Sequence, residues 1–106
     1  MLLSGINKIF LLGEIYNMPV CFECPGMFKE YRFTLSTKEF VPKKDSGVEH
    51  VEYHLIKVFE DCITAGRLLA AGQIVHIEGK IQTYSSIEVG IKRYQTNILA
   101  TRLHHI

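Results

Sequence analysis

The sequence predicts an all-β protein that forms one small domain, with five main strands and one short helix between the third and the fourth. Three observations support this prediction. Stretches of alternating apolar and polar residues, typical of half-buried strands, recur along the chain. Helical spacing is confined to a segment that begins near Asp61 and ends at Gly72. The length of 106 residues suits one domain with one modest core.

The first half of the chain supplies two of these strands. Residues 6–16 have apolar side chains at both parities, so this strand is either covered on both faces or curls sharply at Gly13. Residues 20–23 form a short extended piece before a Pro-Gly turn. Residues 29–40 alternate, with Tyr31, Phe33 and Leu35 on one face and Arg32, Thr34, Ser36 and Lys38 on the other. This strand is therefore half-buried and has a polar, basic side.

The second half continues with a hairpin loop over residues 41–50, with its turn at Asp45-Ser46-Gly47. The next strand spans residues 51–59, and Asp61 is a candidate N-cap for the short helix that Gly72 ends. Strands then follow at 73–84 and 91–103, separated by a loop of turn-forming residues at 85–90. The hydrophobic residues Ile87 and Val89 are able to extend the strands into that loop.

This order of elements is that of an OB-fold, a small five-stranded barrel, and it covers residues 1–106 as a single domain. A doubly wound α/β fold requires helices that alternate with strands throughout, and these are missing. The alternative from the same pattern is another small five-stranded barrel or roll.

Composition narrows the function classes. Twelve Lys and Arg oppose eleven Asp and Glu, so the net charge of +1 does not by itself indicate nucleic-acid binding. No stretch approaches the roughly 18 apolar residues of a membrane helix, and the N-terminus lacks the features of a signal peptide. Three cysteines without a signal peptide indicate free thiols in the cytoplasm.

The Cys21-x-x-Cys24 pair is the strongest candidate for metal or redox chemistry. A structural zinc site needs four ligands, and no second Cys pair or His pair at the required spacing follows. A redox pair belongs at the start of a helix, whereas the flanking Pro19 and Pro25 indicate extended chain. We therefore expect packed thiols here and no metal or cofactor.

Basic and aromatic residues are interleaved on the polar faces of three strands that a barrel brings side by side. This combination suits single-stranded nucleic acid, because rings stack on bases and cations contact phosphates. The alternative is that these rings form cross-strand packing pairs or oligomer contacts. The candidate binding residues are Arg32, Lys38, Phe40, Tyr53, Lys57, Phe59, Lys80 and Tyr84.

Several stretches, in order along nearly the whole chain, resemble the bacterial single-stranded DNA-binding proteins. They are residues 5–9 with 11–13, 33–37, Glu52-Tyr53-His54, 75–83, 92–96 and 100–103. The resemblance implies an OB-fold that assembles as a homotetramer and binds single-stranded DNA without sequence preference. It also implies protection of that DNA during replication, recombination and repair in a cytoplasmic, nucleoid-associated setting.

The resemblance also suggests roles for individual residues. Tyr53 and Phe59 match the stacking aromatics of the third strand, while Phe40 matches another aromatic only loosely, one position out of register. The family aromatic of the fourth strand falls at Ser86, and Tyr84 has the same parity and is able to replace it. The chain has no Trp and ends at Leu103-His104-His105-Ile106 without the acidic tail that recruits replication and repair proteins. We therefore expect a tailless member or a truncated core.

Two other classes of function remain to be compared. The missing tail and the missing Trp favour one alternative. It is a primosome-like OB-fold module that mainly docks proteins and binds DNA weakly. An enzyme is not expected, because no phosphate-binding glycine loop, H-E-x-x-H or G-x-S-x-G motif occurs. Apolar residues at both parities over Ile9–Leu12 predict a homo-oligomer, most simply a tetramer.

Overall fold

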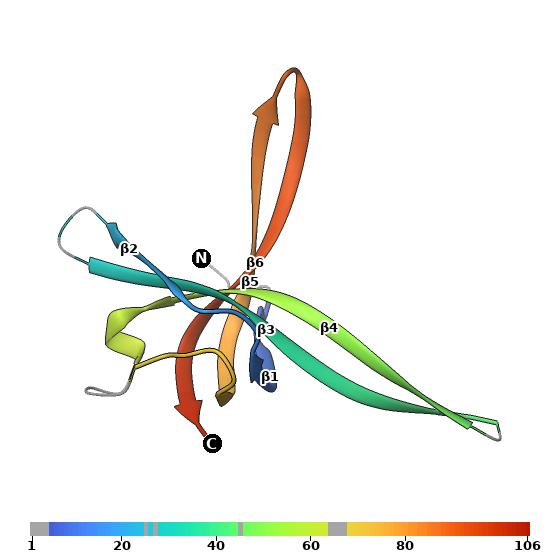
Figure 1. The fold of residues 1–106 in the computed structure, drawn as a ribbon. Helices are drawn as coiled ribbons and strands as arrows, with labels where there is room; N and C mark the ends of the chain where they lie inside the picture. The colour runs from blue at the N-terminus through green and yellow to red at the C-terminus, as the bar shows by residue number, and fades with distance from the viewer. Residues whose placement is uncertain (1–4, 25, 27, 45, 64–67) are drawn as a thin grey trace.

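The computed structural model describes residues 5–24, 26, 28–44, 46–63 and 68–106 (Figure 1). Its elements are β1 (Ile9–Ile15), β2 (Val20–Cys24), β3 (Phe28–Lys43), β4 (Ser46–Phe59), the 3-10 turn η1 (Glu60–Cys62), β5 (Ile74–Glu88) and β6 (Ile91–His105). The five predicted strands are all present, and the short extended piece at 20–23 is an additional strand, β2.

A closed barrel forms because β1 pairs at both of its ends. The sheet order is β1-β5-β6-β4-β3-β2, and β1 also pairs with β3, so five strands close and β2 extends β3 outside the ring. This confirms the predicted OB-fold. β1 passes from β5 to β3 at Gly13, where an added Cβ would lie 2.3 Å from the carbonyl oxygen of Ser36. The backbones of β1 and β3 approach each other so closely here that only glycine fits at the position where the sequence suggested a sharp curl.

The core is filled by the alternate residues that the periodicity assigns to it. Phe33 and Leu35 of β3, Ile56 and Val58 of β4, and Val75 and Ile77 of β5 are buried. Burial of one such side chain contributes about 1.5–3 kcal/mol. The remaining core members are Ile15, Leu69, Ile98, Ala100 and Leu103. Because inward and outward residues alternate, fixing this core also fixes which side chains face outward.

The hairpins β3–β4 and β5–β6 project from the barrel as two arms (Figure 1). The loops predicted over residues 41–50 and 85–90 are wrong in extent, since pairing continues to Lys43 opposite Ser46 and to Glu88 opposite Ile91. Ladder hydrogen bonds outweigh the weak turn preferences of the flanking residues. Asp45, part of the predicted turn, lies outside the described residues. On the β5–β6 arm, two residues with positive φ, Val89 (51°) and Gly90 (75°), make the turn.

The predicted helix is replaced, among the residues that the structure describes, by the short turn η1. Its N-cap is Phe59, which makes no side-chain capping bond, so the expected capping role of Asp61 is wrong. The turn ends because the backbone at Ile63 is extended, with φ −101° and ψ 134°. Residues 64–67 of the predicted helix lie outside the described residues. No helix among the described residues has the length and apolar character needed to cross a membrane.

Both cysteines of the C-x-x-C pair lie in β2, in extended chain rather than at the start of a helix. Cys21 is an exposed free thiol, so the packed environment expected for it is wrong, because β2 lies outside the closed ring of strands. We expect the reduced protein to hold no stoichiometric zinc, because a strand pair of this kind supplies too few ligands for structural zinc. Metal analysis of the reduced protein and of the double variant Cys21→Ser, Cys24→Ser checks this. Zinc near one equivalent, lost in the double variant, would contradict it.

Candidate nucleic-acid interface

The strand register places all the predicted binding residues on the outward face of the sheet. Directly paired residues in an antiparallel ladder share a face. On β3 and β4, Arg32 pairs with Lys57, Ser36 with Tyr53, Lys38 with Val51, and Phe40 with Glu49. On β5 and β6, Lys80 pairs with Leu99 and Tyr84 with Gln95, while Lys57 of β4 pairs with Leu99 across the parallel ladder. The ladder between β3 and β4 has no register shift, so Phe40 shares this face with Tyr53.

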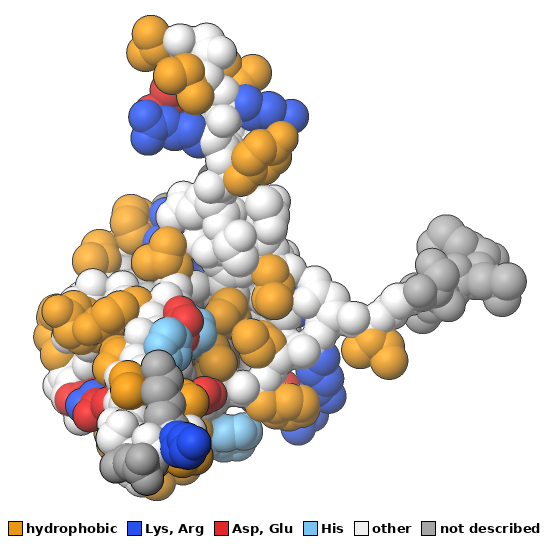
Figure 2. All heavy atoms as spheres, turned by 90° about the vertical axis from the view of Figure 1, so that its right-hand side faces the viewer, with side chains coloured by type: hydrophobic (Ala, Val, Ile, Leu, Met, Phe, Trp, Pro, Cys, Tyr) orange, Lys and Arg blue, Asp and Glu red, His pale blue; other side chains and the backbone are white. Residues whose placement is uncertain are grey.

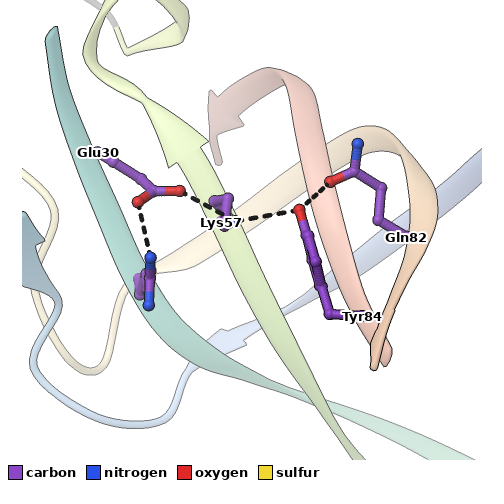
Figure 3. A network of polar contacts seen from close by, with 5 residues as sticks. Glu30, Lys57, Gln82 and Tyr84 are labelled. Atoms are coloured by element: carbon purple, nitrogen blue, oxygen red, sulfur yellow. Dashed lines mark hydrogen bonds and ion pairs between the residues drawn. The ribbon is translucent and has the colours of Figure 1, made fainter. Parts of the chain in front are cut away.

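Lys57 lies at the centre of a polar network that joins three strands (Figure 3). Its Nζ donates to the hydroxyl of Tyr84 at 3.2 Å and lies 3.3 Å from Oε1 of Glu30. The same ammonium is 4.7 Å from the centroid of the Tyr84 ring. The Tyr84 hydroxyl in turn donates to Oε1 of Gln82 at 2.6 Å. The network therefore holds the Tyr84 ring in one orientation on the outer face.

The environment of Lys57 keeps its ammonium charged. Burial alone lowers the pKa of Lys57, but the hydrogen bonds to Tyr84 and Glu30 together outweigh this effect and raise the pKa above its ordinary value. A raised lysine pKa contributes stability that is present below the ordinary pKa and is lost only as the pH rises through the raised one. The network is therefore intact throughout the neutral range.

Glu30 also binds the second cation of this region. Its Oε2 accepts a hydrogen bond from Nη2 of Arg32 at 3.0 Å, and the Arg32 guanidinium lies 4.3 Å from the centroid of the Phe22 ring. Arg32 and Lys57 are direct cross-strand partners, a position where like charges repel. The Glu30 carboxylate is only 5% exposed and offsets this repulsion. Glu30 was not singled out from the sequence, because a glutamate at the parity of Arg32 carries no sign that it is buried.

A groove of about 210 Å³ runs beside this network. Arg32, Lys57, Thr34 and Leu55 contribute from β3 and β4, and three side-chain amides face the same space. These amides, on Asn17, Gln95 and Asn97, were not identified from the sequence, because isolated Asn and Gln carry no motif. The Asn17 Oδ1 accepts a hydrogen bond from the backbone N–H of Thr34 at 2.8 Å, which fixes one wall of the groove.

A second groove, of about 440 Å³, contains Tyr53 and Lys38. Tyr53 meets Tyr16 edge to face with ring centroids 5.0 Å apart, and its side chain remains more than half exposed. Lys38 lies 3.8 Å from the exposed carboxylate of Glu49, a pair that solvent screens. Tyr16 is a further aromatic of this face that sequence reasoning missed, since it ends a strand treated only as an oligomer contact.

The remaining predicted residues lie apart from these two grooves. Phe40 is on the β3–β4 arm, where its ring covers Gly47 so closely that a Cβ there would overlap it. Phe59 lies at the barrel end of β4, opposite Glu30 and next to η1. Lys80 is exposed on β5, two positions before Gln82 on the same face. The structure thus forms two groups of predicted residues. Lys57 lies with Tyr84 and Arg32 in the first, and Tyr53 lies with Lys38 in the second. The other three predicted residues, Phe40, Phe59 and Lys80, lie at the margins of the two grooves.

This face combines rings that are exposed on one side with cations placed beside them. Such an arrangement provides stacking surfaces for flat heteroaromatic groups and charges for phosphates. Fold and face together define the chain as an OB-fold protein with a basic, aromatic outer surface. Comparison with known sequences identifies the family to which the chain belongs.

The sequence model of the Single-strand binding protein family matches residues 6–106, so the chain belongs to that family. A relative in Chlorobaculum tepidum, described as single-stranded DNA-binding protein 1, is 34% identical over 104 residues. The alignment covers 92% of this chain and 62% of that relative, so the chain spans less than two thirds of its length. Membership in a family of binding proteins agrees with the prediction that the chain is not an enzyme.

Solved structures confirm the fold at lower sequence identity. The single-stranded DNA-binding protein of Plasmodium falciparum, described in complex with single-stranded DNA, has a TM-score of 0.85 at 23% identity, over 100% of this chain and 99% of that one. The protein from Thermus aquaticus has a TM-score of 0.82 at 21% identity, covering 96% of this chain and 51% of that chain. A small single-stranded DNA-binding protein of Streptomyces coelicolor has a TM-score of 0.74 at 20% identity, covering 97% and 96%.

Proposed function

We propose that this protein binds single-stranded DNA without sequence preference and protects it during replication, recombination and repair. The observation that carries the proposal is the single outward face on which the register places Tyr53, Tyr84 and their neighbouring cations. Family membership and the described ligand of the Plasmodium structure support the same conclusion. Binding of this kind needs no cofactor and no metal.

The proposed roles differ between residues. Tyr53, Tyr84 and Phe59, with Phe40 on the arm, stack against bases, because each presents a ring on the outer face. Arg32, Lys38 and Lys80 contact phosphates. Lys57 is largely buried, with a side chain 16% exposed, and it orients Tyr84 as well as adding positive charge.

Titration of fluorescent oligo-dT at several salt concentrations tests the proposal. We expect tight binding of dT and mixed-sequence oligomers with similar affinity, and an affinity that falls as salt rises. Replacing Lys80 by Gln should flatten the log-log salt slope by about 0.7, the value for one phosphate contact on a single strand. A strong preference for one base composition, or no binding at all, would contradict the proposal.

A second candidate function is a primosome-like module that docks replication proteins and binds DNA weakly. Exposed hydrophobic and basic side chains on the β5–β6 arm favour it (Figure 2). Ile87, Val89, Ile91 and Tyr94 are exposed there, beside Lys92 and Arg93. The salt titration separates the two functions, since only the first requires tight binding. Replication and repair proteins are partners under either proposal.

We also propose that the chain forms a homo-oligomer, most simply a tetramer. Phe10 and Leu12 project outward from β1, and each is 59% exposed, although both belong to an apolar stretch. Leu12→Glu should therefore lower the oligomeric mass, because it places a charge in a contact that excludes water. Light scattering at micromolar concentration measures this, with Leu68→Glu, an exposed leucine far along the chain, as the control. A monomeric wild-type protein would rule out the assembly.

Residues 1–106 act in this proposal as one DNA-binding domain, since the described strands belong to one sheet. A cytoplasmic, nucleoid-associated location follows from the proposed ligand. The free thiols Cys21 and Cys62 fit a reducing compartment.

A further inference from the structure

Glu30 has a position that binding of a polyanion does not explain. It is a carboxylate on the face proposed to receive phosphates, and its side chain is 5% exposed. Its two oxygens are divided between two cations, Oε2 to Arg32 at 3.0 Å and Oε1 to Lys57 at 3.3 Å. A buried acid at such a site offsets the repulsion between Arg32 and Lys57, and it is also expected to weaken attraction for DNA.

The geometry of this contact is that of a bound phosphate oxygen pair. A guanidinium and an ammonium that converge on two oxygens of one anion form the same arrangement on a carboxylate and on a phosphodiester. Arg32 and Lys57 both line the groove of about 210 Å³, so a strand lying in that groove passes beside the two cations. The Glu30 carboxylate therefore holds the same two cations that a phosphate in this groove would meet.

We infer that Glu30 is an internal competitor for the phosphate backbone, which limits the affinity and the salt dependence of DNA binding; this inference rests on the proposed function. When DNA is bound, Arg32 and Lys57 must divide their hydrogen bonds between the carboxylate and phosphate. Each cation then releases fewer counterions from DNA than a free cation releases. The consequence is a site that still binds DNA tightly, but with lower affinity and a shallower salt dependence than two unshared cations would give.

A purely structural role makes a different prediction. Glu30 separates two like charges that face each other across the ladder, and loss of this function would lower the melting temperature. It would not steepen the dependence of DNA affinity on salt. The salt slope therefore distinguishes a competitor from a residue that only supports the strands.

The test compares Glu30→Gln with the wild-type chain by titration of oligo-dT from 0.05 to 0.3 M salt. Glutamine keeps the size of the side chain and one acceptor oxygen, and it removes the charge. Freeing one or two cations should steepen the log-log slope by about 0.7–1.4 and tighten binding about five- to twenty-fold near 0.1 M salt. The matched control is Glu39→Gln, which removes the same charge from the same strand at an exposed residue of the opposite parity.

Each outcome decides the inference. A steeper slope for Glu30→Gln, with little change for Glu39→Gln, supports it. Equal slopes and affinities in both variants and the wild type overturn it while leaving the proposed function intact. Absence of oligo-dT binding by the wild-type chain overturns the proposed function itself. If Glu30→Gln does not fold, Glu30→Thr supplies a neutral β-branched side chain suited to the strand, and the same slopes are measured.

Discussion

The double substitution Tyr53→Ala, Tyr84→Ala is expected to weaken binding of oligo-dT by about 2–6 kcal/mol, twice the effect of losing one stacked base. The two rings belong to different contacts, since Tyr53 meets Tyr16 while Tyr84 meets Lys57. Their effects should therefore add, each single variant losing about 1–3 kcal/mol. Affinity, melting temperature and oligomeric mass are measured together.

The control for this prediction is Tyr94→Ala. Tyr94 lies opposite Ser85 on the β5–β6 arm, so its side chain is on the other face of the hairpin from Tyr84. It is as exposed as the stacking rings, and its loss should change affinity far less. If Tyr53→Ala binds oligo-dT normally in a folded oligomer, Tyr53 is not part of the site. If it loses oligomeric mass and affinity together, Tyr53 is an interface residue.

Ile77→Ala is expected to lower the free energy of unfolding by about 2–5 kcal/mol. The side chain of Ile77 is fully buried on β5, at the point where β5 pairs with β1 on one side and β6 on the other. Its removal leaves a cavity that the closed barrel cannot collapse to fill, because neighbouring strands are fixed by their ladders. Chemical denaturation measures the change.

Ile87→Ala, on the same strand, is the matched control. Ile87 is on the outer part of the β5–β6 arm and is mostly exposed, so its replacement should change stability by no more than about 0.5 kcal/mol. A loss at Ile87 as large as that at Ile77 would show that the arm packs against another part of the assembly. That result would identify the arm as a contact surface.

Local alternation was sufficient to predict much of the candidate site. The parity of residues 51–59 assigned Tyr53 and Lys57 to the outer face and Ile56 and Val58 to the core, and the structure confirms both assignments. The shared parity of Tyr84 and Ser86 is likewise confirmed by their cross-strand partners. Their roles in DNA binding stay predictions.

Side-chain alternation does not predict which residues meet across neighbouring strands. Glu30 was one more polar residue at an outward position, and only the pairing of Arg32 with Lys57 shows why its carboxylate is buried. The groove amides Asn17, Gln95 and Asn97 come from separated segments and meet only in the folded chain. Among the described residues the expected helix is reduced to η1, because the extended backbone at Ile63 ends the turn.

The all-β class and the residues that face the core follow from side-chain alternation, because alternation is a local property with a period of two. The family resemblance follows instead from specific residue stretches that match in order along the chain. Tertiary structure alone decided how far the two arms extend, where β1 leaves β5 for β3, and which charges share Glu30. The path of β1 depends on barrel closure, which brings together residues distant in sequence. The length of the arms and the contacts of Glu30 depend on pairing between strands, which also sets the burial and repulsion that each charge experiences.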